Sequence, residues 1–137
     1  MRRRNYRDPV LAHEISHVAL RHGTNQLSKQ QLIQIPAALA GAVIPDTAVG
    51  QILKVGLGAG LNGLFLRYSR QDESEADALG ARIMAEAGYN PLELAQIFEK
   101  MAQQGGPGVP EFLSDHPSPG NRVKAIEAVI RTLPDEA

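Results

Sequence analysis

Three residues near the start of the chain, His13, Glu14 and His17, have the types and spacing of a metal-dependent hydrolytic site. Residues four apart lie on one face of a helix, so both imidazoles can reach one ion at about 2.0–2.1 Å. Glu14 would then lie beside the attacking water as its general base. The alternative is a solvated helix face that carries two histidines and a glutamate. We predict a metal site with His13 and His17 as ligands, because a buried helix would leave these polar groups without partners.

A third ligand must come from elsewhere in the chain, because a catalytic zinc site takes three protein ligands and leaves one position for water. Residues 69–77 place Glu73 and Asp77 four apart on one helical face, whereas Glu75 points elsewhere. Glu73 would bind zinc, and Asp77 would accept the free N–H of a ligand histidine, most naturally His13, and fix its tautomer. The alternative is an acidic, solvated helix start stabilised by the helix dipole.

Composition restricts the classes of function. The chain has 137 residues, of which 43% are hydrophobic and 21% charged, and its formal net charge is −1. This balance is typical of one globular domain and predicts no nucleic-acid partner. The chain has no cysteine, so disulfides and thiolate ligands are excluded and any metal must be held by His, Asp or Glu.

Capping and turn residues place the candidate side chains on helices. Asp8 with Pro9 predicts the start of the first helix, and Gly23 predicts its end. The expected helices span residues 9–22, 27–40, 47–68, 70–87, 91–104 and 118 to just before Pro134. Residues 109–117 are expected to form an irregular or short extended loop. No long strand pattern is present, so the fold should be mainly α, with little or no β-sheet.

We expect a single domain over residues 1–137, with a basic, solvated N-terminal segment at 1–8 and a loop at 105–118. An apolar set should bury the first helix against the rest of the chain. It consists of Val10, Leu11, Ile15, Val18 and Ala19.

Residues 27–68 should form an apolar helical hairpin, and its part at 35–66 is rich in Ala, Leu, Val and Gly. Several residues interrupt it, so no stretch reaches the roughly 18 apolar residues that a membrane span requires. They are Pro36, Pro45, Asp46, Gln51 and Lys54. We expect a buried or lid-like pair of helices, with shallow, peripheral membrane contact through residues 35–66 left open.

The chain resembles the HtpX, BepA and CAAX-prenyl-protease group of gluzincin metallopeptidases. Three segments carry the likeness in the same order: LAHEISHVALRHG at 11–23, SRQDESEADALGARIMAEAGYNP at 69–91 and FLSDHPSPGNRV at 112–123. The resemblance implies a compact, helical, zincin-like core that binds one zinc ion and acts on proteins. It also implies that the third ligand is Glu73, four residues before Asp77, and suggests the bacterial cell envelope as the location.

The resemblance also gives a meaning to His116 and Arg122, which the sequence by itself leaves ambiguous. In similar proteins the His-Pro loop approaches the zinc, so His116 is expected either to be a latent fourth ligand or to contact substrate or the oxyanion. Arg122 would stabilise an oxyanion or brace the loop through a carboxylate. His22 lies five residues after His17 and leaves the ligand face, so we expect it to be structural.

The function that follows is a zinc-dependent endopeptidase with His13, His17 and Glu73 as ligands and Glu14 as base. Similar proteins carry segments before HExxH that align the substrate, whereas the motif here begins at residue 13. A truncated or latent, non-catalytic, zinc-stabilised interaction module with His116 closing the site is therefore the alternative. A membrane-surface adaptor that uses the hairpin is a third hypothesis.

Overall fold

A computed structural model describes residues 7–106, 114–116 and 121–134 of the chain. The elements are α1 (Arg7–Ala19), α2 (His22–Val43), α3 (Ala48–Glu86), α4 (Leu92–Gln104) and α6 (Arg122–Ile130). Within the described residues there is no strand, so the prediction of a mainly α fold is confirmed. The predicted features of residues 1–6, the loop at 107–113 and the helix start at 118 lie outside the described residues.

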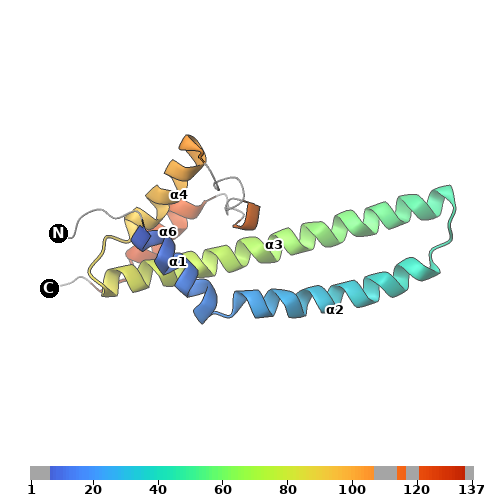
Figure 1. Cartoon of the computed structure of the whole chain (residues 1–137), viewed down its shortest axis with the longest axis horizontal. Coiled ribbons are helices and arrows are strands. Elements are labelled where there is room, and N and C mark those ends of the chain that lie inside the picture. The colour runs from blue at the N-terminus through green and yellow to red at the C-terminus, as the bar shows by residue number, and fades with distance from the viewer. Residues whose placement is uncertain (1–6, 107–113, 117–120, 135–137) are drawn as a thin grey trace.

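Figure 1 shows α1, α4 and α6 gathered around the C-terminal half of α3, while the turn between α2 and α3 lies far from this bundle. Small residues allow a close crossing of α1 on α3. A Cβ added to Gly80 would meet Leu94 Cδ2 at 3.4 Å and the Ala12 carbonyl at 3.5 Å. The buried core around this crossing consists of Ala12, Ala81, Met84, Leu94, Ala95, Phe98 and Ile126.

The face of α1 that is buried differs from the predicted one. Leu11, Ile15 and Val18 are 58%, 46% and 79% exposed. The buried residues of α1 are Pro9, Ala12, His13 and Ser16. The predicted apolar set was therefore wrong. The small Ala12 lets the helices approach closely, and the polar groups beside it have hydrogen-bond partners. Ser16 Oγ, for example, donates to the Ala12 carbonyl at 2.7 Å.

The helix boundaries differ from the predicted ones in two places. α1 ends at Ala19, and Arg21 adopts the left-handed conformation with φ 58°, so Gly23 does not end the first helix as expected. The two helices predicted at 47–68 and 70–87 are a single continuous α3, since no Gly or Pro interrupts residues 64–79. The predicted cap at Thr47 is confirmed, because its side chain accepts from the Gly50 N–H at 3.1 Å.

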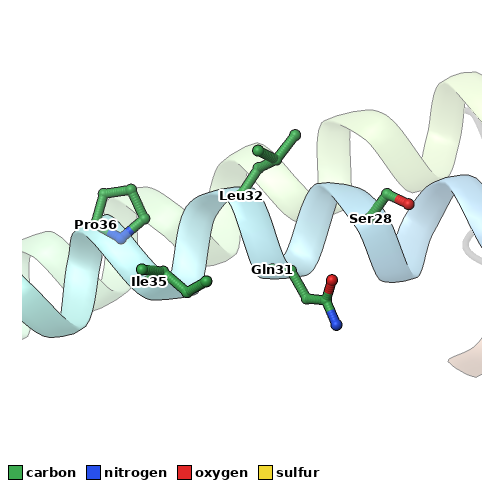
Figure 2. Close-up of a pocket in the computed structure, with 5 residues that line it drawn as sticks. All are labelled: Ser28, Gln31, Leu32, Ile35 and Pro36. Carbon is green, nitrogen blue, oxygen red and sulfur yellow. The ribbon is translucent and has the colours of Figure 1, made fainter.

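The hairpin formed by α2 and the N-terminal half of α3 is exposed, so of the expected buried or lid-like pair the buried form was wrong and the lid-like form stays a prediction. Its exposed large apolar residues are Leu27, Leu32, Ile35, Leu39, Val43, Val49, Ile52, Leu53, Val55, Leu57 and Leu66. On α2, Leu32, Ile35, Leu39 and Val43 follow one another at spacings of three and four residues and so share one face of the helix. This face stays exposed in the structure, so the packing of α2 on α3 does not cover it. Figure 2 shows a depression on α2 lined by Leu32, Ile35 and Pro36 together with the polar Ser28 and Gln31.

By length and composition, α3 could cross a membrane, contrary to the expectation that its interruptions exclude a span, and among the described helices it alone meets that test. One window of 18 residues within it has a mean hydropathy of 1.3, and only 6% of that window is buried.

The contrast between the buried bundle and the exposed hairpin predicts where shortening an apolar side chain destabilises the protein. Leu94 is fully buried in the core, whereas Leu32 is 74% exposed on α2. We expect Leu94→Ala to lower the free energy of unfolding by about 2–5 kcal/mol and Leu32→Ala by less than about 0.5 kcal/mol. Urea denaturation followed by circular dichroism measures both, and equal losses would contradict the placement of the core.

Candidate metal centre

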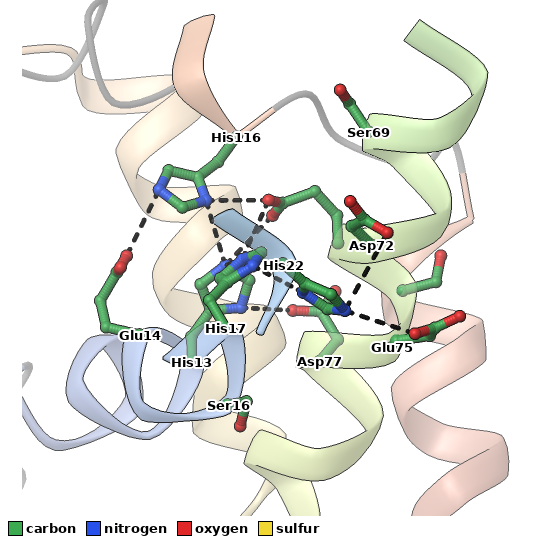
Figure 3. A network of polar contacts seen from close by, with 12 residues as sticks. His13, Glu14, Ser16, His17, His22, Ser69, Asp72, Glu75, Asp77 and His116 are labelled. Carbon is green, nitrogen blue, oxygen red and sulfur yellow. Dashed lines mark hydrogen bonds and ion pairs between the residues drawn. The ribbon is translucent and has the colours of Figure 1, made fainter. Parts of the chain in front are cut away.

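Four possible metal ligands from three separate parts of the chain meet beside the crossing of α1 and α3. His13 and His17 lie one turn apart on α1, and His116 comes from the segment at 114–116 (Figure 3). The fourth, Glu73, comes from α3. The ligand atoms of all four lie within 4.8 Å of one another. The structure thus brings together every residue that the sequence analysis considered as a ligand.

The distances between these atoms suit a small tetrahedral cation. His13 Nε2 lies 3.0 Å from His17 Nε2 and 3.1 Å from Glu73 Oε2. Glu73 Oε1 lies 3.0 Å from His17 Nε2 and 2.9 Å from His116 Nδ1. Four ligands at about 2.0–2.1 Å from one tetrahedral ion would lie about 3.3 Å apart. The donor set therefore fits zinc, with imidazole and carboxylate groups of the kinds that zinc prefers.

A buried network holds the inner side of this cluster. His13 is fully buried, and its Nδ1 lies 3.0 Å from Asp77 Oδ1. A carboxylate only accepts hydrogen bonds, so His13 Nδ1 donates and its Nε2 presents a lone pair to the centre. Arg122 donates from Nε to Asp77 Oδ2, and one of its terminal nitrogens lies 3.0 Å from Glu73 Oε2. The Arg122 guanidinium also lies 3.9 Å from the centroid of the Phe98 ring.

The buried charges favour a cation at the centre. Burial lowers the pKa of His13, but hydrogen bonds and charges from Asp77 and Glu73 outweigh burial and raise this pKa above its ordinary value. Burial also acts to raise the pKa of Glu73, yet hydrogen bonds from His116, His13 and His17 hold it far below its usual range. Two buried carboxylates and one arginine leave one negative charge, which attracts a proton or a metal ion.

The outer side of the cluster is open. The Glu14 side chain is 45% exposed, and those of His17 and His116 are 16% and 17% exposed. Glu14 points towards His116, with its Oε1 3.4 Å from His116 Nε2 (Figure 3). The candidate base thus lies at the solvent-facing rim, next to the candidate fourth ligand.

His22 is the residue whose contact with the candidate site the sequence analysis missed. It is 4% exposed, and its Nδ1 lies 2.9 Å from His17 Nδ1. Five residues along an unbroken helix would rotate it by about 140° from His17. The left-handed conformation of Arg21 breaks the helix and turns His22 towards His17. Residues 18–21 contain no Gly or Pro that would predict this break. Its position inside the first resembling segment was the only signal.

Comparison with known proteins decides the family. The sequence profile of peptidase family M48 matches residues 2–130, which is nearly the whole chain. The chain belongs to peptidase family M48. Membership of this family and the His/Glu cluster together imply a bound metal, and the resemblance found from the three motifs is confirmed.

Two kinds of curated relative cover most of this M48 chain. The mitochondrial metalloendopeptidase OMA1 of Saccharomyces cerevisiae is 37% identical over 123 residues, covering 84% of this chain and 33% of the relative. The OMA1 of Arabidopsis thaliana is 33% identical, covering 85% and 23%. The β-barrel assembly-enhancing protease of Escherichia coli is 30% identical, covering 83% and 25%. The chain thus spans about a quarter to a third of these relatives. No solved structure matches it.

The buried Arg122 predicts a stability effect with a matched control. Arg122→Met would leave Glu73 and Asp77 without their guanidinium partner in a buried setting, so we expect a loss of about 3–5 kcal/mol. Arg131→Met removes a 78% exposed side chain, so its effect should stay below about 0.5 kcal/mol. Urea denaturation in the presence of a chelator measures both losses. Similar values would show that Arg122 does not balance the buried carboxylates.

Proposed function

We propose that this M48 chain carries the catalytic core of a zinc-dependent endopeptidase that hydrolyses peptide bonds in protein substrates. One observation supports this most strongly: three predicted ligands from two helices, His13, His17 and Glu73, direct their ligand atoms to one point. Membership of the M48 family and relatives named as metalloendopeptidases or proteases support the same reaction.

The proposed chemistry divides between the metal and one carboxylate. Bound zinc supplies Lewis-acid chemistry, because it lowers the pKa of a water molecule to about 7 and polarises the scissile carbonyl. Glu14 takes a proton from the attacking water and passes it to the leaving amine. Its exposure at the rim allows it to meet both water and a substrate chain. Asp77 holds His13 in the tautomer that directs Nε2 inwards.

His116 determines whether this arrangement is open or closed. Its Nδ1 contacts Glu73 and His13 at 2.9 and 3.3 Å, so it would be a fourth ligand to a bound zinc ion. We propose that this is a resting form and that His116 withdraws when a substrate carbonyl binds. The alternative is a non-catalytic zinc-stabilised module, in which four protein ligands form a permanent structural site. The exposed Glu14 favours the enzyme, since a structural site needs no base at its rim.

Arg122 has contacts that favour a bracing role over an oxyanion role. Its guanidinium faces Asp77, Glu73 and the Phe98 ring, and its side chain is 6% exposed. We propose that it balances the charge of the two carboxylates and keeps them in place.

We propose further that the exposed part of the hairpin, residues 35–66, contacts the apolar region of a lipid bilayer. Its large apolar side chains are exposed along both arms, and an exposed apolar surface of this size is typical of a site that contacts a partner or a membrane. The stretch from Val49 to Leu66 would be about 27 Å long, slightly shorter than the roughly 30 Å of a bilayer core. At the tip, Asp46 and Lys54 pair at 3.8 Å, which lowers the penalty for inserting either charge.

The base of the hairpin has the residue types found where proteins meet lipid headgroups. Lys29 Nζ lies 4.8 Å from the centroid of the Tyr68 ring, and Arg67 and Arg70 flank this pair in exposed positions. Tyrosine and basic residues are enriched at the membrane–water boundary.

A cell-envelope location is consistent with this membrane contact and remains our proposal. The Escherichia coli relative is named for β-barrel assembly, while the other two are named as mitochondrial.

The role of Glu14 is tested by Glu14→Gln, a substitution that leaves all four ligand atoms in place. We expect the variant to keep the same zinc content and to lose casein cleavage by about 10²-fold or more, because the proton acceptor is removed. Zinc is measured by atomic emission and cleavage by gel electrophoresis, with chelator-treated protein as the control. Unchanged cleavage would reject Glu14 as the base. Zinc-loaded wild type that cleaves nothing would favour the structural module.

The lipid contact is tested by flotation with phosphatidylcholine–phosphatidylglycerol vesicles. Val55→Asp places a charge on the hairpin, whereas Val18→Asp makes the same change on α1, and the two valines are 73% and 79% exposed. We expect wild type and Val18→Asp to float, and Val55→Asp to bind at least about tenfold more weakly. Wild type that stays at the bottom of the gradient, or equal losses in the two variants, would reject the hairpin as the lipid contact.

A further inference from the structure

A second group of polar side chains adjoins the metal centre and is not used in the proposed reaction. His22 opens α2, and its Nε2 lies 3.3 Å from Glu75 Oε2 and 4.0 Å from Asp72 Oδ1 on α3 (Figure 3). On its other side, His22 Nδ1 meets the metal ligand His17. A line of contacts therefore runs from carboxylates on α3, through one buried imidazole, to the ring of a ligand.

The hydrogen-bonding possibilities of these groups fix the positions of the protons. Carboxylates only accept, so His22 Nε2 carries a hydrogen and, in a neutral imidazole, its Nδ1 is an acceptor. Only a donor can satisfy that acceptor at 2.9 Å, so the hydrogen of His17 lies on its Nδ1. His17 Nε2 then carries no hydrogen, and its lone pair is directed towards the candidate metal centre. There Nε2 lies 3.0 Å from both His13 Nε2 and Glu73 Oε1.

We propose that His22 is a positioning residue that sets the tautomer and ring orientation of His17 for metal binding. Asp77 does this for His13 through a direct carboxylate contact, whereas His17 depends on an inserted imidazole held by Glu75 and Asp72. The proposal deepens the proposed zinc site and rests on it. Groups of this kind typically change metal affinity by about 10–100-fold when removed.

A separate metal site formed by His22, Asp72 and Glu75 is the competing explanation, because their ligand atoms also cluster. The surroundings of Asp72 argue against it. Gln26 Nε2 donates to Asp72 Oδ2 at 3.1 Å, and Lys29 Nζ lies 3.8 Å from Asp72 Oδ1. A lysine beside the carboxylate already supplies the positive charge that a metal would bring.

Two substitutions at His22 separate a hydrogen-bonding role from a packing role. His22→Phe keeps a ring but removes the acceptor, whereas His22→Asn keeps an oxygen near the place of Nδ1 but loses the ring. We expect the zinc affinity, measured by chelator competition on the whole chain, to fall at least about tenfold in His22→Phe and to stay within about threefold of wild type in His22→Asn. A packing role predicts the reverse order, and that order would overturn the proposal.

The tautomer of His17 is measured directly by long-range ¹H–¹⁵N NMR of the histidine rings. We expect the hydrogen on Nδ1 of His17 in the wild type and a mixture of tautomers in His22→Phe. A hydrogen on His17 Nε2 in the wild type would overturn the proposal. The NMR measurement needs neither cleavage nor bound zinc, so it tests the proposal on His22 separately from the proposed enzyme. A chain that binds zinc but does not cleave protein would contradict the proposed enzyme and would leave the proposal on His22 standing.

A milder variant keeps the test valid should His22→Phe fail to fold. Glu75 has a 51% exposed side chain, so Glu75→Ala spares the core, and we expect it to weaken zinc binding by about threefold. Glu86→Ala, at an exposed position near the end of the same helix, is the matched control and should change nothing. Equal affinities for both variants, or two zinc ions per chain with one lost in Glu75→Ala, would overturn the proposal.

Discussion

The fold of the site depends on one close crossing, in which α1 lies on α3 with Ala12 against Gly80. At this crossing His13 is completely buried, and its ring nitrogens lie 3.1 Å from Glu73 Oε2 and 3.0 Å from Asp77 Oδ1. Buried carboxylates and an imidazole are costly unless each finds a partner. Arg122 and the neighbouring imidazoles are those partners, and the described part of the chain leaves no buried side-chain N or O atom unsatisfied.

Sequence reasoning selected the side chains that cluster in the candidate metal centre, because helical spacing is a strict geometric rule. Four-residue spacing put His13 with His17 and Glu73 with Asp77, and each pair does share a helix face. Burial was harder to foresee. We expected Leu11, Ile15 and Val18 to be buried, yet the polar side of α1 turns inwards. Apolar periodicity cannot reveal that a helix buries its polar groups when their partners lie 60 residues away in sequence.

His22 and the hairpin show two other limits of the sequence. The contact between His22 and His17 depends on one left-handed residue, Arg21, whose type does not favour that conformation. The hairpin has the composition of a buried element, but no described part of the chain covers its large apolar side chains. Composition identifies apolar residues without stating what will surround them, which is why burial and lipid contact could not be told apart from sequence.

Contacts at the base of the hairpin link it to the candidate metal centre. His22, the first residue of α2, contacts His17, and α3 carries Glu73 and Asp77 beyond the base of its own arm. Gln26 and Lys29 of α2 both reach Asp72 of α3, one residue before Glu73. A tilt of the hairpin relative to the bundle must therefore break these contacts or displace His22. Lipid that held the arms in one orientation would thereby also hold the base of the hairpin against the ring of His17.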